Sequence, residues 1–303
     1  MTSLGEGCFY LTGLKSVKIP SSITSLSTDC FQFCSSLESV EIPSSVTSFG
    51  EYCFYGCSKL ESIDIPSSVT SLGIGCFMQC SYLEKVVIPS SITSLSTNCF
   101  WGCSGLKNIE IPSSVTLLAG GCFLGCSSLE SIIIPSSVEE MGGLIFVNCS
   151  NLANVTLSSN ITSIGYSAFS DCKSLKNLTI SKDVTSIKDI RFNNDYEDLE
   201  LESVYVAWQN PIEAGSFFNR IKISNCTLYV PQGTKEAYAN ADVWKDFGNI
   251  IEYDATGIDK VTNRSDVKEI SRYSLNGQRV TSPTKGVNIV VYSDGSIKKV
   301  AVQ

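Results

Sequence analysis

Residues 53–75 read Cys-Phe-Tyr-Gly-Cys-Ser-Lys-Leu-Glu-Ser-Ile-Asp-Ile-Pro-Ser-Ser-Val-Thr-Ser-Leu-Gly-Ile-Gly, and this unit recurs along the chain every 23 residues. The period is marked by prolines that each follow an isoleucine and precede Ser-Ser: Pro20, Pro43, Pro66, Pro89, Pro112 and Pro135. Less regular copies, which keep Phe146 and Phe169, continue the pattern to about residue 210. Repeats of this length are typical of stacked units, because a single unit cannot bury its apolar side alone.

Each unit contains one short strand. Apolar and polar residues alternate at Val40, Glu41 and Ile42, which is the pattern of a strand with one buried face. Pro43 ends that strand because proline has no N–H for the ladder, and Ser44–Ser45 is expected to form the turn.

The rest of the unit returns to the core. We expect Val46 and Phe49 to point inward, and Cys53, Phe54 and Cys57 to share one face of a short helical turn. Neighbouring strands would lie ~4.8 Å apart in the stack. The sequence therefore predicts an α/β repeat solenoid of eight or nine 23-residue units, with a parallel β-sheet and short helical turns.

Composition excludes several classes of function. The chain has 303 residues, 30 acidic and 22 basic, and no histidine. Without histidine, Ser-His-Asp and Cys-His catalysis and histidine metal sites are excluded. The net charge of −8 argues against nucleic-acid binding, and no apolar run reaches the ~18 residues of a transmembrane segment. No phosphate-binding loop or catalytic signature occurs, so we expect neither an enzyme nor a cofactor.

A family resemblance rests on residues 168–175, Ala-Phe-Ser-Asp-Cys-Lys-Ser-Leu, and on the recurring Ile-Pro-Ser-Ser-Val-Thr-Ser segment. These motifs resemble the BspA-like subfamily of leucine-rich repeats. The resemblance implies a leucine-rich-repeat solenoid over residues 1–203. It also implies an extracellular or outer-surface location and adhesion to host or microbial surface proteins, without naming a ligand.

The sequence changes character after the repeats. Residues 204–254 are expected to form a C-terminal cap, with a strand at Thr227–Val230, a turn and N-cap at 231–234 and a helix at Lys235–Asn240. Within this cap we expect Ala237 and Tyr238 to face inward, a further strand at Ile250–Tyr253, and Trp208, Trp244 and Phe247 to supply large apolar side chains.

Residues 255–266 are predicted to form a linker, and residues 267–303 a small β-module with turns at Asn276-Gly277 and Asp294-Gly295. This module resembles the C-terminal sorting domain of Bacteroidetes-type secretion substrates; the alternative is an accessory β-module. At the other end, Thr2–Cys8 aligns with Thr47–Cys53, in the middle of a repeat. We therefore expect a signal peptide and earlier repeats to be missing from this chain.

Most of the fourteen cysteines form two columns that follow the period. One column holds Cys8, Cys30, Cys53, Cys76, Cys99 and Cys122, and the other holds Cys34, Cys57, Cys80, Cys103, Cys126, Cys149 and Cys172. Disulfides, a metal site and redox catalysis are the alternatives to free thiols. Parallel ladders do not bring four thiolates together around zinc. We expect free, buried thiols that pack as small apolar side chains.

Two columns of residues are expected on the outer face of the sheet. They are Lys18, Glu41, Asp64, Val87, Glu110, Ile133, Thr156 and Thr179, and beside them Lys15, Glu38, Glu61, Glu84, Lys107, Glu130, Ala153 and Lys176. The candidate binding residues in these columns are Glu38, Glu41, Glu61, Asp64, Glu84, Glu110 and Glu130. Such a face could bind a basic protein surface or, weakly, calcium; the alternative is a solvated face that blocks unwanted sheet contacts.

A third column follows the repeated phenylalanine: Tyr10, Gln32, Tyr55, Met78, Trp101, Leu124, Val147 and Ser170. An exposed aromatic stripe is typical of interaction sites, and partial burial against the next unit is the alternative. The sequence thus predicts a cell-surface or secreted binding protein, an adhesin that contacts host or neighbouring-cell macromolecules. The second hypothesis is a glycan-binding module that uses Tyr55 and Trp101.

Overall fold

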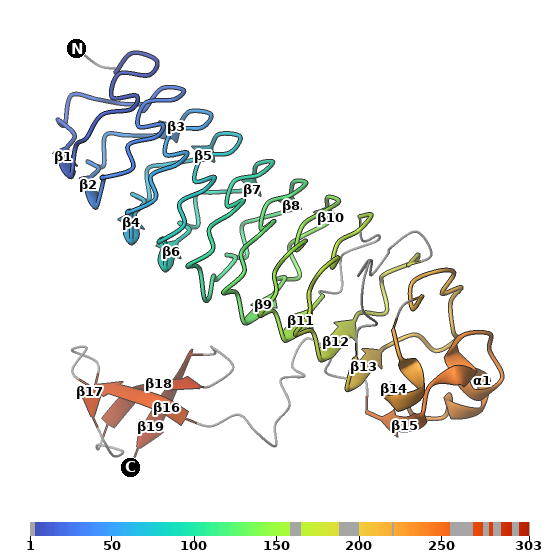
Figure 1. Cartoon of the computed structure of the whole chain (residues 1–303). Helices are drawn as coiled ribbons and strands as arrows, with labels where there is room; N and C mark the ends of the chain where they lie inside the picture. Colours follow the sequence, from blue (N-terminus) through green and yellow to red (C-terminus); the bar gives the residue numbers. More distant parts are fainter. Residues whose placement is uncertain are drawn as a thin grey trace. The chain divides into compact units, whose positions relative to one another are not determined.

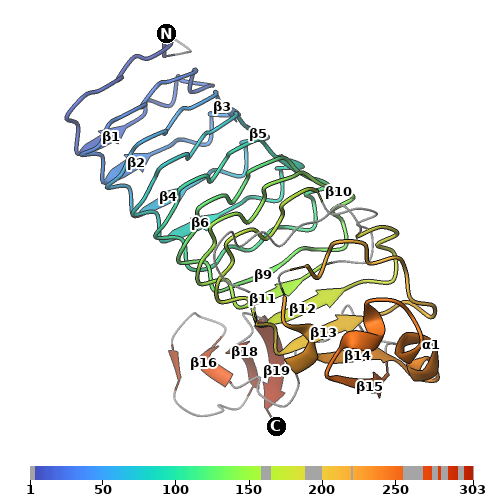
Figure 2. The ribbon, with the colours of Figure 1, turned by 45° about the vertical axis from the view of Figure 1, so that its right-hand side comes forward.

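Two units, residues 1–255 and 256–303, make up the computed structural model of the chain. The structure describes residues 4–157, 165–187, 200–219 and 221–254, and the backbone of four strands after residue 268. The first unit is a stack of coils (Figures 1 and 2). Longer strands line one wall of the stack, which we call the long wall. Shorter strands line the opposite wall, which we call the short-strand wall.

The strands of the long wall pair in parallel, coil after coil. They are β1 (Ser16–Lys18), β2 (Ser39–Glu41), β4 (Ser62–Asp64), β6 (Lys85–Val87), β9 (Ser131–Ile133), β11 (Asn154–Thr156), β12 (Asn177–Ile180), β13 (Ser203–Val206), β14 (Thr227–Pro231) and β15 (Asn249–Tyr253). β1 pairs with β2, β4 pairs with β6, and β9 and β11–β15 form one six-stranded sheet. The predicted parallel solenoid is confirmed.

Strand register shows where the repeat unit holds. Ser16 pairs with Ser39, Ser62 with Lys85, and Asn154 with Asn177, and each partner lies one repeat length further along the chain. The following steps lead from Asn177 to Ser203, Thr227 and Asn249; the first two are longer than the repeat and the last is shorter. The 23-residue period is therefore strict only in the earlier coils of residues 1–255. The later coils keep their strands in register by changing the length of the loops.

The opposite wall consists of two-residue strands: β3 (Ser48–Phe49), β5 (Ser71–Leu72), β7 (Ser94–Leu95), β8 (Leu117–Leu118) and β10 (Glu140–Met141). The expected turn joins the two walls, because the Val46 amide donates to the Pro43 carbonyl oxygen at 3.1 Å. In four turns the second serine then bonds to the preceding coil, as Ser68 Oγ does to the Val46 carbonyl oxygen at 2.6 Å. In the turn after Pro135, the buried Ser137 Oγ makes no such bond.

The predicted helical turns of the repeats are wrong, so the α/β description of the solenoid is supported only in part. Within residues 4–157, the structure has turns and strands but no helix. The residue before each cysteine of a repeat has positive φ, for example Asn98 at 58° and Gly102 at 73°. A left-handed residue every fourth position breaks an α-helix. Alternate amides therefore turn outward toward the next coil.

Backbone hydrogen bonds follow this alternation. Three amides bond within the coil to the carbonyl three residues before: Cys99 to Ser96, Trp101 to Asn98 and Cys103 to Phe100, each at 3.1 Å. The three amides between them bond to the next coil: Asn98 to Gly120, Phe100 to Cys122 and Gly102 to Leu124, at 3.1, 2.9 and 2.7 Å. The turn is a further ladder between coils and not a helix.

The core of the stack is a ladder of phenylalanines. Rings of neighbouring coils lie nearly parallel from Phe9 to Phe169, with centroids 5.0–5.8 Å apart and interplanar angles of 4–11°. All of these rings except Phe9 are buried. Val46, Phe49, Cys53, Phe54 and Cys57 are also buried, as predicted.

All fourteen cysteines are free, and all except Cys8 are buried. Those of the second column donate their S–H to a phenylalanine carbonyl of the preceding coil, as Cys103 Sγ does to the Phe77 oxygen at 3.1 Å. Burial raises the pKa of the Cys80 and Cys149 thiols to about 12. The thiols therefore act as packed, neutral donors that tie one coil to the next.

The last coils of this unit replace the repeated core with larger aromatic residues. Trp208, Trp244 and Phe247 are buried, as expected. The predicted strands are confirmed as β14 and β15, and the predicted helix as α1 (Lys235–Ala239); two 3-10 helices, η1 (Ile223–Asn225) and η2 (Trp244–Asp246), complete this region. The boundary predicted at 203/204 falls within β13, and the same sheet continues to Tyr253.

Two details of helix α1 differ from the sequence prediction. Tyr238 is buried as expected, but Ala237 is exposed. Thr234 occupies the N-cap without a side-chain cap bond, since its Oγ1 donates to the Pro231 carbonyl. The Glu252 carboxylate on β15 instead accepts the Lys235 amide at 2.9 Å, and this bond lowers the pKa of Glu252.

The second unit contains a four-stranded antiparallel sheet. Its strands are β16 (Glu269–Ser274), β17 (Arg279–Val280), β18 (Gly286–Tyr292) and β19 (Ile297–Val302), in the order β17-β16-β18-β19. The predicted Asn276-Gly277 and Asp294-Gly295 turns and residues 255–266 lie outside the described residues. Among the residues described, no helix is long and apolar enough to cross a membrane.

Core packing predicts a clear contrast between two neighbouring substitutions. Leu83 is fully buried, and Leu83→Ala is expected to lower the free energy of unfolding by about 2–5 kcal/mol through the cavity it leaves. Lys85→Ala, on the exposed face of β6, is expected to change it by less than about 0.5 kcal/mol. Urea denaturation measures both values, and equal effects would contradict the assignment of inner and outer faces.

The buried thiols predict a loss of stability at alkaline pH. A thiol whose pKa is higher in the folded chain contributes stability that is complete below its unfolded pKa of about 8.5 and is lost as pH rises through its folded pKa. The free energy of unfolding should therefore fall between about pH 8.5 and about pH 12. Urea denaturation under reducing conditions measures this slope. Cys80→Ala should make the slope shallower, and a wild-type profile flat over this range would refute the explanation.

Candidate functional site

The outer face of the long wall carries the predicted acidic columns. A strand turns alternate side chains to opposite faces, so Ile63 of β4 is buried while Ser62 and Asp64 point outward. All seven predicted carboxylates are exposed: Glu38, Glu41, Glu61, Asp64, Glu84, Glu110 and Glu130. The backbone keeps them in rows, since the Glu84 amide donates to the Glu61 carbonyl at 3.0 Å.

Lysines from neighbouring coils neutralise two of these carboxylates. Lys18 pairs with Glu41 at 2.6 Å, and Lys107 pairs with Glu84 at 3.5 Å. The other five form no ion pair with any residue that the structure describes: Glu38, Glu61, Asp64, Glu110 and Glu130. We call these five residues the unpaired acidic set. Like charges on adjacent strands repel, so this face has a net attraction for cationic groups.

The acidic side chains do not form a metal site. Within the described part of the chain, no group of three or more acidic or cysteine side chains is arranged to hold a metal ion. The carboxylates are spread along the wall, one or two to a coil, and do not converge on one point. This arrangement suits an extended cationic surface better than a single calcium ion.

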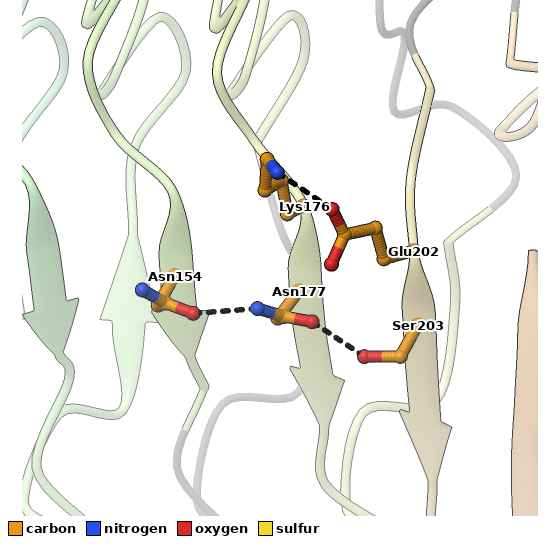
Figure 3. Close-up of polar contacts among 5 residues, drawn as sticks. All are labelled: Asn154, Lys176, Asn177, Glu202 and Ser203. Carbon is orange, nitrogen blue, oxygen red and sulfur yellow. Dashed lines mark hydrogen bonds and ion pairs between the residues drawn. The ribbon is translucent and has the colours of Figure 1, made fainter. Parts of the chain in front are cut away.

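The same wall changes chemistry after the acidic coils, as Figure 3 shows. Asn177 Nδ2 donates to Asn154 Oδ1 at 2.7 Å, and Ser203 Oγ donates to Asn177 Oδ1 at 2.6 Å. Beside this row, Lys176 and Glu202 neutralise each other at 2.6 Å. This polar row was not predicted from the sequence. The spacing of Asn154 and Asn177 by one repeat could have indicated that their side chains lie side by side. Ser203, however, comes later in the chain than the period predicts, so the sequence does not align it with them.

Two tyrosines continue the outer face beyond the polar row. The rings of Tyr205 and Tyr229 stack with centroids 4.2 Å apart, and Tyr253 meets Tyr205 edge-on. Burial, together with the neighbouring Tyr229, raises the pKa of the Tyr205 phenol to about 12. Both tyrosines are half-buried, and the Tyr205 hydroxyl is hydrogen-bonded to Tyr229 and Ser203.

The predicted aromatic column lies elsewhere on the coil, on the turns. Tyr55 and Trp101 are both half-buried. Tyr55 packs against Phe33 with ring centroids 4.6 Å apart and against Tyr52 at 6.0 Å. The alternative to an exposed aromatic stripe was partial burial against the neighbouring coils. The contacts of Tyr55 support partial burial. Tyr10 is the exception, with 45% of its surface exposed.

Comparison with known proteins agrees with the repeat pattern. A family model described as "BspA type Leucine rich repeat region (6 copies)" matches residues 2–128 and 76–200, which together span residues 2–200. A comparison with curated proteins finds no match.

Solved structures give likenesses in the fold. A leucine-rich repeat protein from Bacteroides ovatus is 24% identical with a TM-score of 0.61, over 83% of this chain and 64% of that one. The chain thus spans less than two thirds of that protein's length. A leucine rich cell surface protein from Faecalibacterium prausnitzii is 21% identical over 85% and 84% of the two chains, with a TM-score of 0.40. A leucine rich repeat protein from T. pallidum is 24% identical over 57% and 71%, with a TM-score of 0.41.

Proposed function

The chain belongs to the BspA-type leucine-rich repeat family, and we propose that it is a surface-displayed or secreted binding protein that acts as an adhesin. It holds the outer face of its long wall toward a protein with a basic surface, on a host or a neighbouring cell. The repeat scaffold contributes rigidity, and many modest contacts along the wall contribute avidity. The proposal contains no chemical step and no cofactor.

The unpaired acidic set is the observation that supports this proposal best. Its carboxylates point from one wall at the regular spacing of the coils, and no described cation neutralises them. Bringing them together costs free energy through like-charge repulsion. A basic partner offsets that repulsion and gains rapid, electrostatically steered association.

The outer acidic face also suits the location proposed. Proteins of this family are typically surface-associated, and an extended wall of exposed side chains serves contact better than it serves catalysis. The second hypothesis, glycan capture by Tyr55 and Trp101, has less support because both side chains are half-buried among their neighbours.

Charge reversal on the wall tests the proposal. The chain is screened by surface plasmon resonance against purified host extracellular-matrix, mucosal and bacterial surface proteins. The double variant Glu38→Lys, Glu61→Lys should weaken binding to its protein partner by about tenfold or more and reduce the salt dependence of the affinity. Both changes follow because the variant loses two anionic contacts and gains two repulsive ones.

A matched control places the same charge change on another side of the coil. Glu139 and Glu140 are exposed beside and within β10, on the short-strand wall. Glu139→Lys, Glu140→Lys should leave the affinity within about twofold of the wild type. The proposal fails if no protein in the panel binds, or if the control variant weakens binding as much as the test variant.

A further inference from the structure

The six-stranded sheet presents an uncharged outer face. Each of its strands directs two side chains to the outer side, in two rows across the sheet, and of these Thr179 and Ser203 are buried beneath their neighbours. The first row is Ser131, Asn154, Asn177, Ser203, Thr227 and Asn249, and the second is Ile133, Thr156, Thr179, Tyr205, Tyr229 and Ile251. In the earlier coils the same two rows contain Lys18, Glu41, Asp64, Lys85 and Glu110. In these two rows charge therefore stops at β9, while hydrogen-bonding groups continue; the column beside them keeps Glu130, Lys176 and Glu202.

We propose that this uncharged face, from β9 to β15, is a binding site for a neutral oligosaccharide. It begins beside Glu130, the last residue of the unpaired acidic set, and extends away from the acidic coils. Its first row consists entirely of amide and hydroxyl side chains, which both donate and accept hydrogen bonds. These are the groups that match the hydroxyls of a sugar.

The polar row is already ordered before a ligand arrives. Asn177 accepts from Ser203 and donates to Asn154, so its side-chain amide is held in one orientation (Figure 3). Asn154 ends this chain of bonds and is exposed, which leaves its Nδ2 amide group available to a ligand. Pre-ordered groups lose little conformational entropy on binding, which favours recognition of a flexible, hydroxylated ligand.

The tyrosines extend the same hydrogen-bonding surface. The Tyr205 phenol interacts with both Ser203 and Tyr229, which joins the polar row to the stacked rings. Because the two rings stack on each other, one face of each ring is occupied, and each ring is still partly exposed. The site thus offers hydroxyl contacts together with narrow apolar edges, as the alternating polar and C–H surfaces of a sugar require.

The absence of charge selects among possible ligands. A charged ligand would lose hydration on this face without gaining an opposite charge. Of the ionic groups beside the two rows, Lys176 and Glu202 are paired with each other, and the unpaired Glu130 lies at the β9 end. A protein partner would need a larger apolar centre, whereas the exposed apolar residues Ile133 and Ile251 lie on the two outermost strands of the sheet.

Binding to neutral sugars tests the proposal on the full chain. Isothermal titration calorimetry is carried out with neutral linear gluco-, manno-, xylo- and galacto-oligosaccharides, and with an oligogalacturonate as the charged comparison. We expect at least one neutral oligosaccharide to bind, with an affinity unchanged when the NaCl concentration is raised tenfold. Asn154→Ala should weaken that binding by about tenfold, as the loss of one or two hydrogen bonds predicts.

Two further variants separate recognition from folding. Tyr229→Phe removes one hydroxyl and keeps the ring stack, and it should also weaken binding several-fold. Asn151→Ala changes an exposed asparagine of the same coil that lies off the sheet, and it should have no effect. The proposal is overturned if no neutral sugar binds, or if Asn154→Ala and Tyr229→Phe bind as the wild type does. It is also overturned if only the oligogalacturonate binds.

Sugar binding on β9–β15 should not depend on the protein contact proposed above. Glu38→Lys, Glu61→Lys should leave sugar binding unchanged, because those residues lie on the earlier coils. Sugar binding lost through this double variant would place the ligand on the acidic wall and contradict the site on β9–β15. Protein binding without sugar binding would leave the adhesin proposal intact and reject this one.

Discussion

Every coil depends on its neighbours for its backbone hydrogen bonds. The strands of the long wall are three to five residues long, too short to be stable alone, and each pairs in parallel with at least one neighbouring strand. The cysteine turns follow the same rule, because left-handed residues such as Asn98 and Gly102 direct alternate amides toward the next coil. The side chains reinforce this dependence, since the phenylalanine rings and the cysteine S–H groups also make their contacts between coils.

Because stacking constrains the other positions, residue type can vary on the outer face of the long wall. Inner positions, turns and the residues before cysteine are all committed to stacking, whereas the outer positions of the long wall contact solvent. The outward positions within the strands are charged in the early coils and uncharged from β9 onward, while the column just before the strands keeps Glu130, Lys176 and Glu202. A single scaffold therefore presents two chemically distinct surfaces at the same spacing, and each has its own suitable class of partner.

The repeat itself was predictable from the sequence because the core residues recur with the coil. Periodic proline, leucine, phenylalanine and cysteine revealed the strand, the turn and the buried face, and the acidic columns were correctly placed outward. The helical turn was wrong because spacing at i and i+4 is shared by a helix and by this turn. Phe33 and Tyr52 adopt positive φ as asparagine or glycine would, so residue type gave no warning. The polar row was missed because its members are unevenly spaced along the chain, and only strand register brings them together.

Hydrogen exchange of the turn amides tests the account most directly. If coils are joined through these turns, the amides of Phe54, Phe77, Phe100 and Phe123, which donate to the following coil, should exchange as slowly in NMR experiments as those of strand residues Ile63 and Val86. Slow exchange at both places would show that turn and strand open together, as one stacked unit. Fast exchange at the four phenylalanines, with protected strands, would mean that the turns are surface loops and would contradict the stacking described.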